Sequence, residues 1–148
     1  MSSSRNGDIL IVEDNPSDAE LTLRALKKAH VANDVHVVRD GAEALEFLFA
    51  RGAYAGRAGS ALPRVVLLDL KLPKVDGLEV LRRVKADERT KAIPVIVLTS
   101  SREEKDLVAS YDRGANSFIV KPVESEKFFD AVKEIGLYWL LLNEPAHG

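Results

Sequence analysis

The chain has 148 residues, 46% of them apolar and 30% charged, which suits a single globular domain with a core of ordinary size. Its net charge of −2 argues against nonspecific nucleic-acid binding, and the absence of cysteine excludes disulfides and thiolate metal sites. The N-terminal MSSSRNG lacks the apolar core of a signal peptide, and no apolar run reaches the length of a membrane span, so we expect a soluble, cytoplasmic protein.

Strand and helix patterns alternate from the start of the chain. The apolar run DILIVED, residues 8–14, predicts a strand that closes on two acids. Asn15 is suited to cap the following helix, whose apolar stripe is expected to end at His30. Residues 35–40 then predict a second strand, and residues 41–53 predict a second helix.

The alternation resumes after residues 54–63, a small, glycine-containing segment that we interpret as a loop. Three further strands are predicted from apolar runs, at residues 65–69, 93–100 and 116–122. Three further helices are predicted to begin at Gly77, Arg102 and Glu124. The second of these helices is expected to end at a glycine C-cap, Gly114.

Most of these strands are unbroken apolar runs, which are typical of a parallel sheet covered by helices on both faces. The pattern predicts an α/β fold, a doubly wound sheet of five parallel strands in the flavodoxin-like order 2-1-3-4-5. We expect one domain at residues 8–138, preceded by a flexible lead at residues 1–7 and followed by a tail at residues 139–148.

Polar residues end four of the strands, at the edge where doubly wound sheets bind ligands. Glu13 and Asp14 close the first strand, Asp69 the third, Thr99 the fourth and Lys121 the fifth. Because the first and third strands would be neighbours, three carboxylates would meet and repel one another unless a divalent cation joined them. Such hard oxygen ligands suit Mg²⁺, or Mn²⁺, better than zinc.

The chemistry that these residues favour is phosphoryl transfer. Magnesium takes few carboxylates, which leaves Asp69, at the centre, as the candidate nucleophile for an aspartyl phosphate. Lys121 supplies a positive charge and Thr99 a hydroxyl for the phosphoryl oxygens. Each residue alone would be an ordinary strand end, but phosphoryl transfer depends on positioning and charge neutralisation, which the set together provides.

These motifs resemble the receiver domain of two-component response regulators, over residues 8 to about 138. The resemblance rests on ED after the first strand, LLDLKLPKVDG around Asp69, VLTS and VKP. The spacing also matches, with a proline four and a glycine eight residues after Asp69, and a lysine 22 residues after Thr99. The resemblance implies that Asp69 is the phosphoacceptor. It further implies that a metal is held by three carboxylates and one main-chain carbonyl, those of Glu13, Asp14, Asp69 and Lys71.

The resemblance also implies a switch. Thr99 would turn toward the phosphoryl group, and Phe118 would be the aromatic residue that moves with it. Lys121 would pair with the phosphoryl group, and the Lys121–Pro122 peptide bond would be cis. Phosphorylation would then shift the chain between two states with different binding surfaces.

Within this family the chain resembles the single-domain, chemotaxis-regulator-like proteins that partner bacterial and cyanobacterial phytochrome histidine kinases. A longer loop after the second helix and the ending YWLLLNEP carry this narrower likeness. It implies a sensor histidine kinase of the phytochrome type as partner. The protein would be a signalling receiver rather than an enzyme, catalysing only its own phosphorylation and dephosphorylation. The stretch after Lys121 is too short for a DNA-binding domain, so we expect output through protein partners and no nucleic acid.

Three alternatives share part of this pattern. A haloacid-dehalogenase-type phosphatase also phosphorylates an aspartate, but it needs a second acid two residues later, where this chain has Lys71. A flavodoxin-like flavin binder has a phosphate loop rich in Ser, Thr and Gly, whereas EDNPSD would repel a phosphate in the absence of metal. A pseudo-receiver normally lacks one of the key residues, and here none is missing.

The last predicted helix ends in an apolar tail. Phe128, Val132, Ile135 and Trp139 are spaced as one helical face, which a helix packed on its own sheet explains. The three leucines at residues 140–142 follow without alternation and cannot all face one core. Since leftover apolar residues tend to mark a contact surface, we predict a homodimer through the last helix and the tail.

Overall fold

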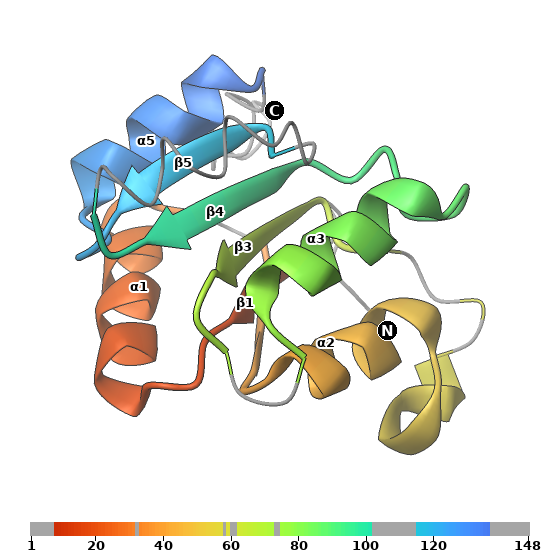
Figure 1. Ribbon diagram of the computed structural model, residues 1–148. Helices are drawn as coiled ribbons and strands as arrows, with labels where there is room; N and C mark the ends of the chain where they lie inside the picture. The colour runs from red at the N-terminus through yellow and green to blue at the C-terminus, as the bar shows by residue number, and fades with distance from the viewer. Residues whose placement is uncertain are drawn as a thin grey trace, which may run out of the picture.

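The computed structural model describes residues 8–31, 33–57, 59, 62–72, 75–101 and 115–136 (Figure 1). Three sequence predictions lie outside these residues: the lead at residues 1–7, the helix at residues 102–114, and the tail at residues 139–148. The described strands are β1 (Ile9–Val12), β2 (Val35–Val38), β3 (Val65–Asp69), β4 (Val95–Thr99) and β5 (Ser117–Val120). The described helices are α1 (Pro16–Lys28), α2 (Gly41–Phe49), the 3₁₀ helix η1 (Gly52–Arg57), α3 (Gly77–Ala86) and α5 (Ser125–Glu134).

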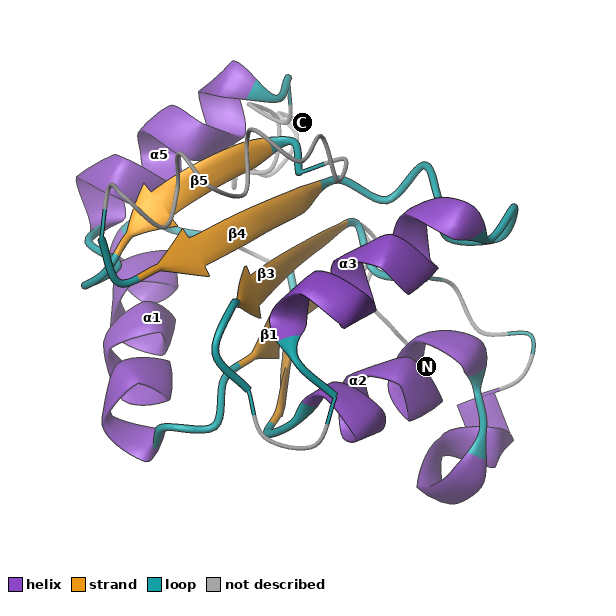
Figure 2. Ribbon diagram, viewed as in Figure 1, coloured by secondary structure: helices purple, strands orange, loops and turns teal. Residues whose placement is uncertain are grey.

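The five strands form one parallel sheet in the order β2-β1-β3-β4-β5, which confirms the predicted fold. The arrows of β3, β4 and β5 point the same way in Figure 2. Strand β1 lies between β2 and β3, with Ile9 opposite both Val35 and Val65. The strand order therefore reverses between β1 and β3, and the carboxyl ends of these two strands are adjacent.

Helices cover both faces of the sheet (Figure 1), and each face has its own core. Alternate strand residues point to opposite faces, so every central strand contributes to both cores. Leu68 and Val97 pack with α2 and α3, whereas Leu67 and Leu98 pack with α1 and α5. Burial on both faces explains why β3 and β4 are unbroken apolar runs in the sequence.

The helix starts are set by side-chain caps. Asn15 accepts a hydrogen bond from the Asp18 N–H, with Pro16 as the first residue of α1. Asp40 and Asp76 cap α2 and α3 in the same way. The predicted end of the α1 stripe at His30 was wrong, because α1 ends at Lys28 and His30 is exposed with φ of 61°.

The segment after α2 differs from the sequence prediction. We expected helix to residue 53 and a loop from residue 54, but α2 ends at Phe49 and Ala50 adopts a left-handed conformation with φ of 53°. The chain then forms η1, held by Tyr54, whose hydroxyl donates to Glu43 at 2.6 Å and whose ring meets Phe47 edge-on at 5.2 Å. These contacts stabilise a helical turn that has no apolar periodicity.

Helix α5 packs on the domain's own sheet. Phe128 and Val132 are fully buried and Ile135 is partly buried, so the described part of the predicted stripe belongs to the core. Its contribution to a homodimer remains a prediction. No helix in the described ranges has the length and hydropathy needed to cross a membrane.

Candidate functional site

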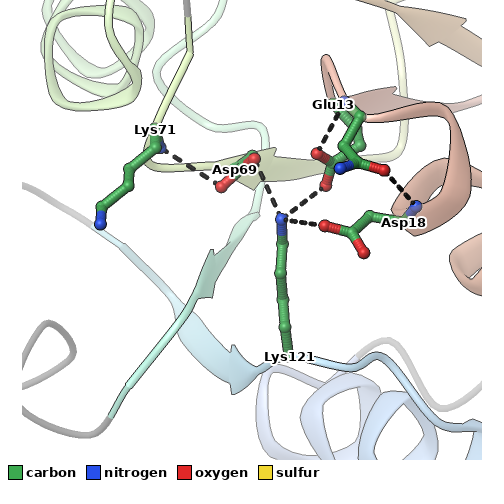
Figure 3. A network of polar contacts seen from close by, with 6 residues as sticks. Glu13, Asp18, Asp69, Lys71 and Lys121 are labelled. Atoms are coloured by element: carbon green, nitrogen blue, oxygen red, sulfur yellow. Dashed lines mark hydrogen bonds and ion pairs between the residues drawn. The ribbon is translucent and has the colours of Figure 1, made fainter.

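Polar side chains from the ends of four strands lie at the carboxyl edge of the sheet, and Figure 3 shows those of Glu13, Asp69 and Lys121. Glu13 follows β1, Asp69 and Thr99 end β3 and β4, and Lys121 follows β5. Glu13, Asp69 and Thr99 are 1%, 5% and 0% exposed, although each carries a polar group that burial disfavours. Parallel pairing of these strands is what brings residues distant in the sequence to this one edge.

Three carboxylates lie close enough to share a metal ion. One oxygen each from Glu13, Asp14 and Asp69 lies within 4.8 Å of the others, and Asp14 is exposed to solvent. The donors are hard oxygens, so the residues present fit a divalent cation such as Mg²⁺ or Mn²⁺. The Lys71 N–H donates to Asp69 Oδ1 at 3.2 Å, which places the Lys71 backbone beside the same carboxylate.

Lys121 lies at the centre of the cluster. Its Nζ is 3.0 Å from Asp18 Oδ2 and 3.1 Å from Asp69 Oδ2, and it donates a hydrogen bond to each. It is also 2.9 Å from Glu13 Oε1, an ion pair rather than an aligned hydrogen bond. Burial alone would lower the pKa of Lys121, but the carboxylates of Glu13, Asp18 and Asp69 outweigh it and raise that pKa above its usual value.

Glu13 is the most deeply buried of the carboxylates. Burial raises its pKa to about 7, with Asp69 adding to the shift and Lys121 opposing it. Its Oε2 accepts a hydrogen bond from the Asn15 N–H at 3.2 Å. A second cation beside Glu13 and Asp69 would favour their charged forms.

Thr99 presents a buried hydroxyl that has no hydrogen-bond partner among the described residues. Its Oγ1 is fully buried and makes no hydrogen bond within the described part of the chain. A buried hydroxyl of this kind destabilises the folded state unless a ligand supplies an acceptor. Its main-chain carbonyl accepts from the Lys121 N–H at 2.8 Å, so the ends of β4 and β5 are tied together. Phe118 lies on β5, partly buried against the core that α2 and α3 cover. The peptide bond between Lys121 and Pro122 is cis.

A glycine allows α3 to begin directly against the end of β3. The Gly77 N–H donates to the Leu70 carbonyl at 3.0 Å. A Cβ at Gly77 would collide with the Asp69 carbonyl oxygen and would lie 2.7 Å from Leu70 Cα. These are main-chain atoms, so the glycine eight residues after Asp69 is required by close backbone approach.

The structure brings Glu13, Asp14, Asp69 and Lys121 together, and it adds one residue that the sequence analysis did not include. The Lys71 side chain points away from Asp69 in Figure 3, while its N–H contacts that carboxylate. Asp18 was missed by the sequence analysis, although it contacts Lys121. The available signal was its place in the first turn of the helix that begins immediately after β1, at the same edge of the sheet.

A protein-family comparison agrees with this geometry. The family model described as the response regulator receiver domain matches residues 9–133 of the chain. That range contains every residue of the cluster.

Two curated relatives are similar over most of their length. The probable methanogenesis regulatory protein FilR2 of Methanothrix harundinacea is 45% identical over 135 residues, covering 91% of this chain and 84% of the relative. The response regulator Rcp1 of Synechocystis is 39% identical over 132 residues, covering 89% of this chain and 88% of Rcp1.

Solved structures also share the fold. The bacteriophytochrome response regulator AtBRR is 59% identical with a TM-score of 0.87, covering 93% of this chain and 98% of AtBRR. The Mn²⁺-bound form of Rcp1 is 39% identical with a TM-score of 0.71, covering 90% and 94% of the two chains. The phosphorylated cyanobacterial phytochrome response regulator RcpA is 42% identical with a TM-score of 0.72 and the same coverage.

Proposed function

Because this chain belongs to the response regulator receiver family, we propose that Asp69 is the residue on which it accepts a phosphoryl group from a sensor histidine kinase. The observation that carries this assignment is the position of the Asp69 carboxylate. It is buried at the point where the strand order reverses, with Lys121 on one oxygen and the Lys71 N–H on the other. Carboxylates in such positions form acyl phosphates.

The transfer requires no chemistry beyond positioning and charge balance. An Asp69 oxygen attacks phosphorus as the bond from phosphorus to the histidine nitrogen breaks, and that nitrogen keeps the electron pair and takes up a proton. Lys121 and the Thr99 hydroxyl then bind the phosphoryl oxygens. In hydrolysis, water attacks phosphorus and the oxygen–phosphorus bond breaks, which restores the Asp69 carboxylate and releases phosphate. The protein's own catalysis is limited to these two steps.

We propose Mg²⁺ as the physiological metal, with Mn²⁺ able to replace it. Glu13, Asp14, Asp69 and the Lys71 main-chain carbonyl would hold the ion, and the Mn²⁺-bound form of the similar Rcp1 supports this assignment. When bound, the ion neutralises charge on the carboxylates and the transferred group. Glu13 and Asp69 would meet it as charged carboxylates, each retaining a main-chain N–H donor.

Phosphorylation is proposed to act through Thr99 and Phe118. The buried Thr99 hydroxyl has no acceptor in the described ranges of the chain, and a phosphoryl oxygen on Asp69 would supply one. Movement of Thr99 would open space for Phe118, which is only partly buried on β5. The surface around β5 would then differ between the unphosphorylated and phosphorylated states. Each partner would bind the state for which it has the higher affinity.

We propose a phytochrome-type sensor histidine kinase as the phosphoryl donor, and we propose that the two proteins meet in the cytoplasm. The support is the similarity to AtBRR, Rcp1 and RcpA, two of which are described as phytochrome or bacteriophytochrome regulators. Neither a phosphatase nor a flavin binder is favoured, since Lys71 occupies the place of the second acid and Glu13 and Asp14 occupy the place of a phosphate loop.

Metal removal tests this function. With Mg²⁺, the wild-type chain is expected to take up one phosphoryl group from acetyl phosphate, labile in both acid and base and detected by the intact mass. With EDTA, labelling should fall by at least tenfold, because three carboxylates would then repel the anionic donor. Equal labelling with and without EDTA would contradict the proposed metal site, and no labelling under either condition would contradict the function.

We also propose a homodimer that uses α5 and the tail. Phe128 and Val132 are buried in the core, but Phe129 on the same helix is 37% exposed, with Lys133 Nζ 5.3 Å from its ring centroid. Sedimentation at tens of micromolar should give a dimer mass for the whole chain and a monomer mass for a chain truncated after Tyr138. Monomers in both samples would overturn the dimer, and dimers in both would move the interface away from the tail.

A further inference from the structure

Lys121 has more carboxylate partners than the metal and phosphoryl chemistry requires. An ammonium group has three N–H donors, and Glu13, Asp18 and Asp69 each bring an oxygen within 3.1 Å of the Lys121 nitrogen. Two of the three donors form hydrogen bonds, to Asp18 and Asp69, and the Glu13 oxygen lies beside the same nitrogen as an ion pair (Figure 3). A phosphoryl oxygen that binds Lys121 therefore has to compete with carboxylate oxygens that already surround its nitrogen.

The three partners differ in what else they can do. Glu13 and Asp69 belong to the group of carboxylates that fits a metal ion, so metal binding would draw their oxygens away from Lys121. Asp18 does not belong to that group, and it contacts Lys121 from the first turn of α1. Asp18 is thus the carboxylate that would stay on Lys121 once metal is bound, and the one that would compete with the phosphoryl group for its ammonium group.

We propose that Asp18 is a positioning residue that competes with the phosphoryl group for Lys121 and so favours the unphosphorylated state. This inference rests on the proposed function of Asp69. The Asp18 side chain is 36% exposed, so it can turn to solvent when the phosphoryl group takes its place. The negative charge of Asp18 also repels the anionic phosphoryl group. This charge lies beside Lys121, the cation that would bind that group.

The test measures affinity for beryllium fluoride, a phosphoryl mimic, in saturating Mg²⁺ by fluorine NMR. Asp18→Asn keeps the shape of the side chain and removes its charge, and we expect it to bind the mimic about fivefold more tightly, as an ion pair of this partial exposure allows. The matched control is Glu20→Gln, which removes a charge from the same helix at an exposed ion pair with Arg24. Its affinity should equal that of the wild type.

A double-mutant cycle shows whether the effect passes through Lys121. In a Lys121→Met background, Asp18→Asn should change the affinity by less than twofold, because there is no ammonium to compete for. An equal gain in both backgrounds would mean simple charge repulsion and would overturn the proposed competition. Unchanged or weaker binding by Asp18→Asn alone would overturn it as well.

The proposed function and this inference fail in different ways. If the wild-type chain does not bind beryllium fluoride with Mg²⁺ present, the assignment of Asp69 is wrong. If the wild type binds and Asp18→Asn binds equally well, only the role of Asp18 is wrong. Thermal unfolding of each variant identifies a loss of fold, and the Asn15 cap of α1 should survive because it uses the Asp18 backbone rather than its side chain.

Discussion

Replacing Asp69 with asparagine is expected to abolish labelling by acetyl phosphate in the presence of Mg²⁺. The amide lacks the nucleophilic carboxylate oxygen, while its size and its hydrogen-bonding oxygen remain, so the fold should be kept. Lys121 would still have Glu13 and Asp18 as partners, and one source of repulsion within the carboxylate cluster would be gone. Intact-mass measurement of wild type and variant under the same conditions gives the stoichiometry.

The matched control for this variant is Asp76→Asn. Asp76 lies in the same β3–α3 connection and caps α3 by accepting from the Glu79 N–H, a role that asparagine also fills. Asp76→Asn should be labelled like the wild type. This result would show that losing an aspartate near the site does not by itself abolish labelling. If Asp69→Asn were labelled to the wild-type level, Asp69 could not be the acceptor.

Gly77→Ala is expected to damage both stability and phosphorylation. The added Cβ would meet the main chain of Asp69 and Leu70, so the loop after β3 or the start of α3 has to move. Overpacking of this kind costs about 1–3 kcal/mol of unfolding free energy. Because the displaced backbone carries Asp69 and leads to the Lys71 carbonyl, labelling should slow as well. Urea denaturation and the initial labelling rate measure the two effects.

Gly56→Ala provides the comparison. Gly56 lies in η1, and a Cβ there would meet nothing within 4 Å. It should change the unfolding free energy by less than about 1 kcal/mol and should leave labelling unchanged. If Gly77→Ala behaved like Gly56→Ala, the close approach of α3 to the end of β3 would not matter for the site.

The sheet and most of the site could be predicted because each rests on a strong pattern. Strand β3 is buried on both faces, and this burial produces the unbroken run that predicts a parallel sheet. Once the sheet is parallel, the end of every strand lies at one edge. Glu13, Asp69 and Lys121 therefore had to be close, whatever their separation in the sequence.

What could not be predicted depends on single contacts between elements. Asp18 carries no strand-end signal, and its ion pair with Lys121 depends on how α1 is set against β5. The helical turn η1 is held by contacts with α2 that include the hydrogen bond from Tyr54 to Glu43 and the packing of Tyr54 and Arg57 on the Phe47 ring. Helix α1 ends two residues before His30, where a left-handed residue turns the chain out of the apolar stripe.

The most direct test of the account is to locate the phosphoryl group on the wild-type chain. The protein is labelled with acetyl phosphate and Mg²⁺, the acyl phosphate is reduced with borohydride, and the peptides are sequenced by mass spectrometry. One modified residue is expected, Asp69, converted to homoserine. Modification at Asp14, Asp18 or any other carboxylate, with Asp69 intact, would contradict it.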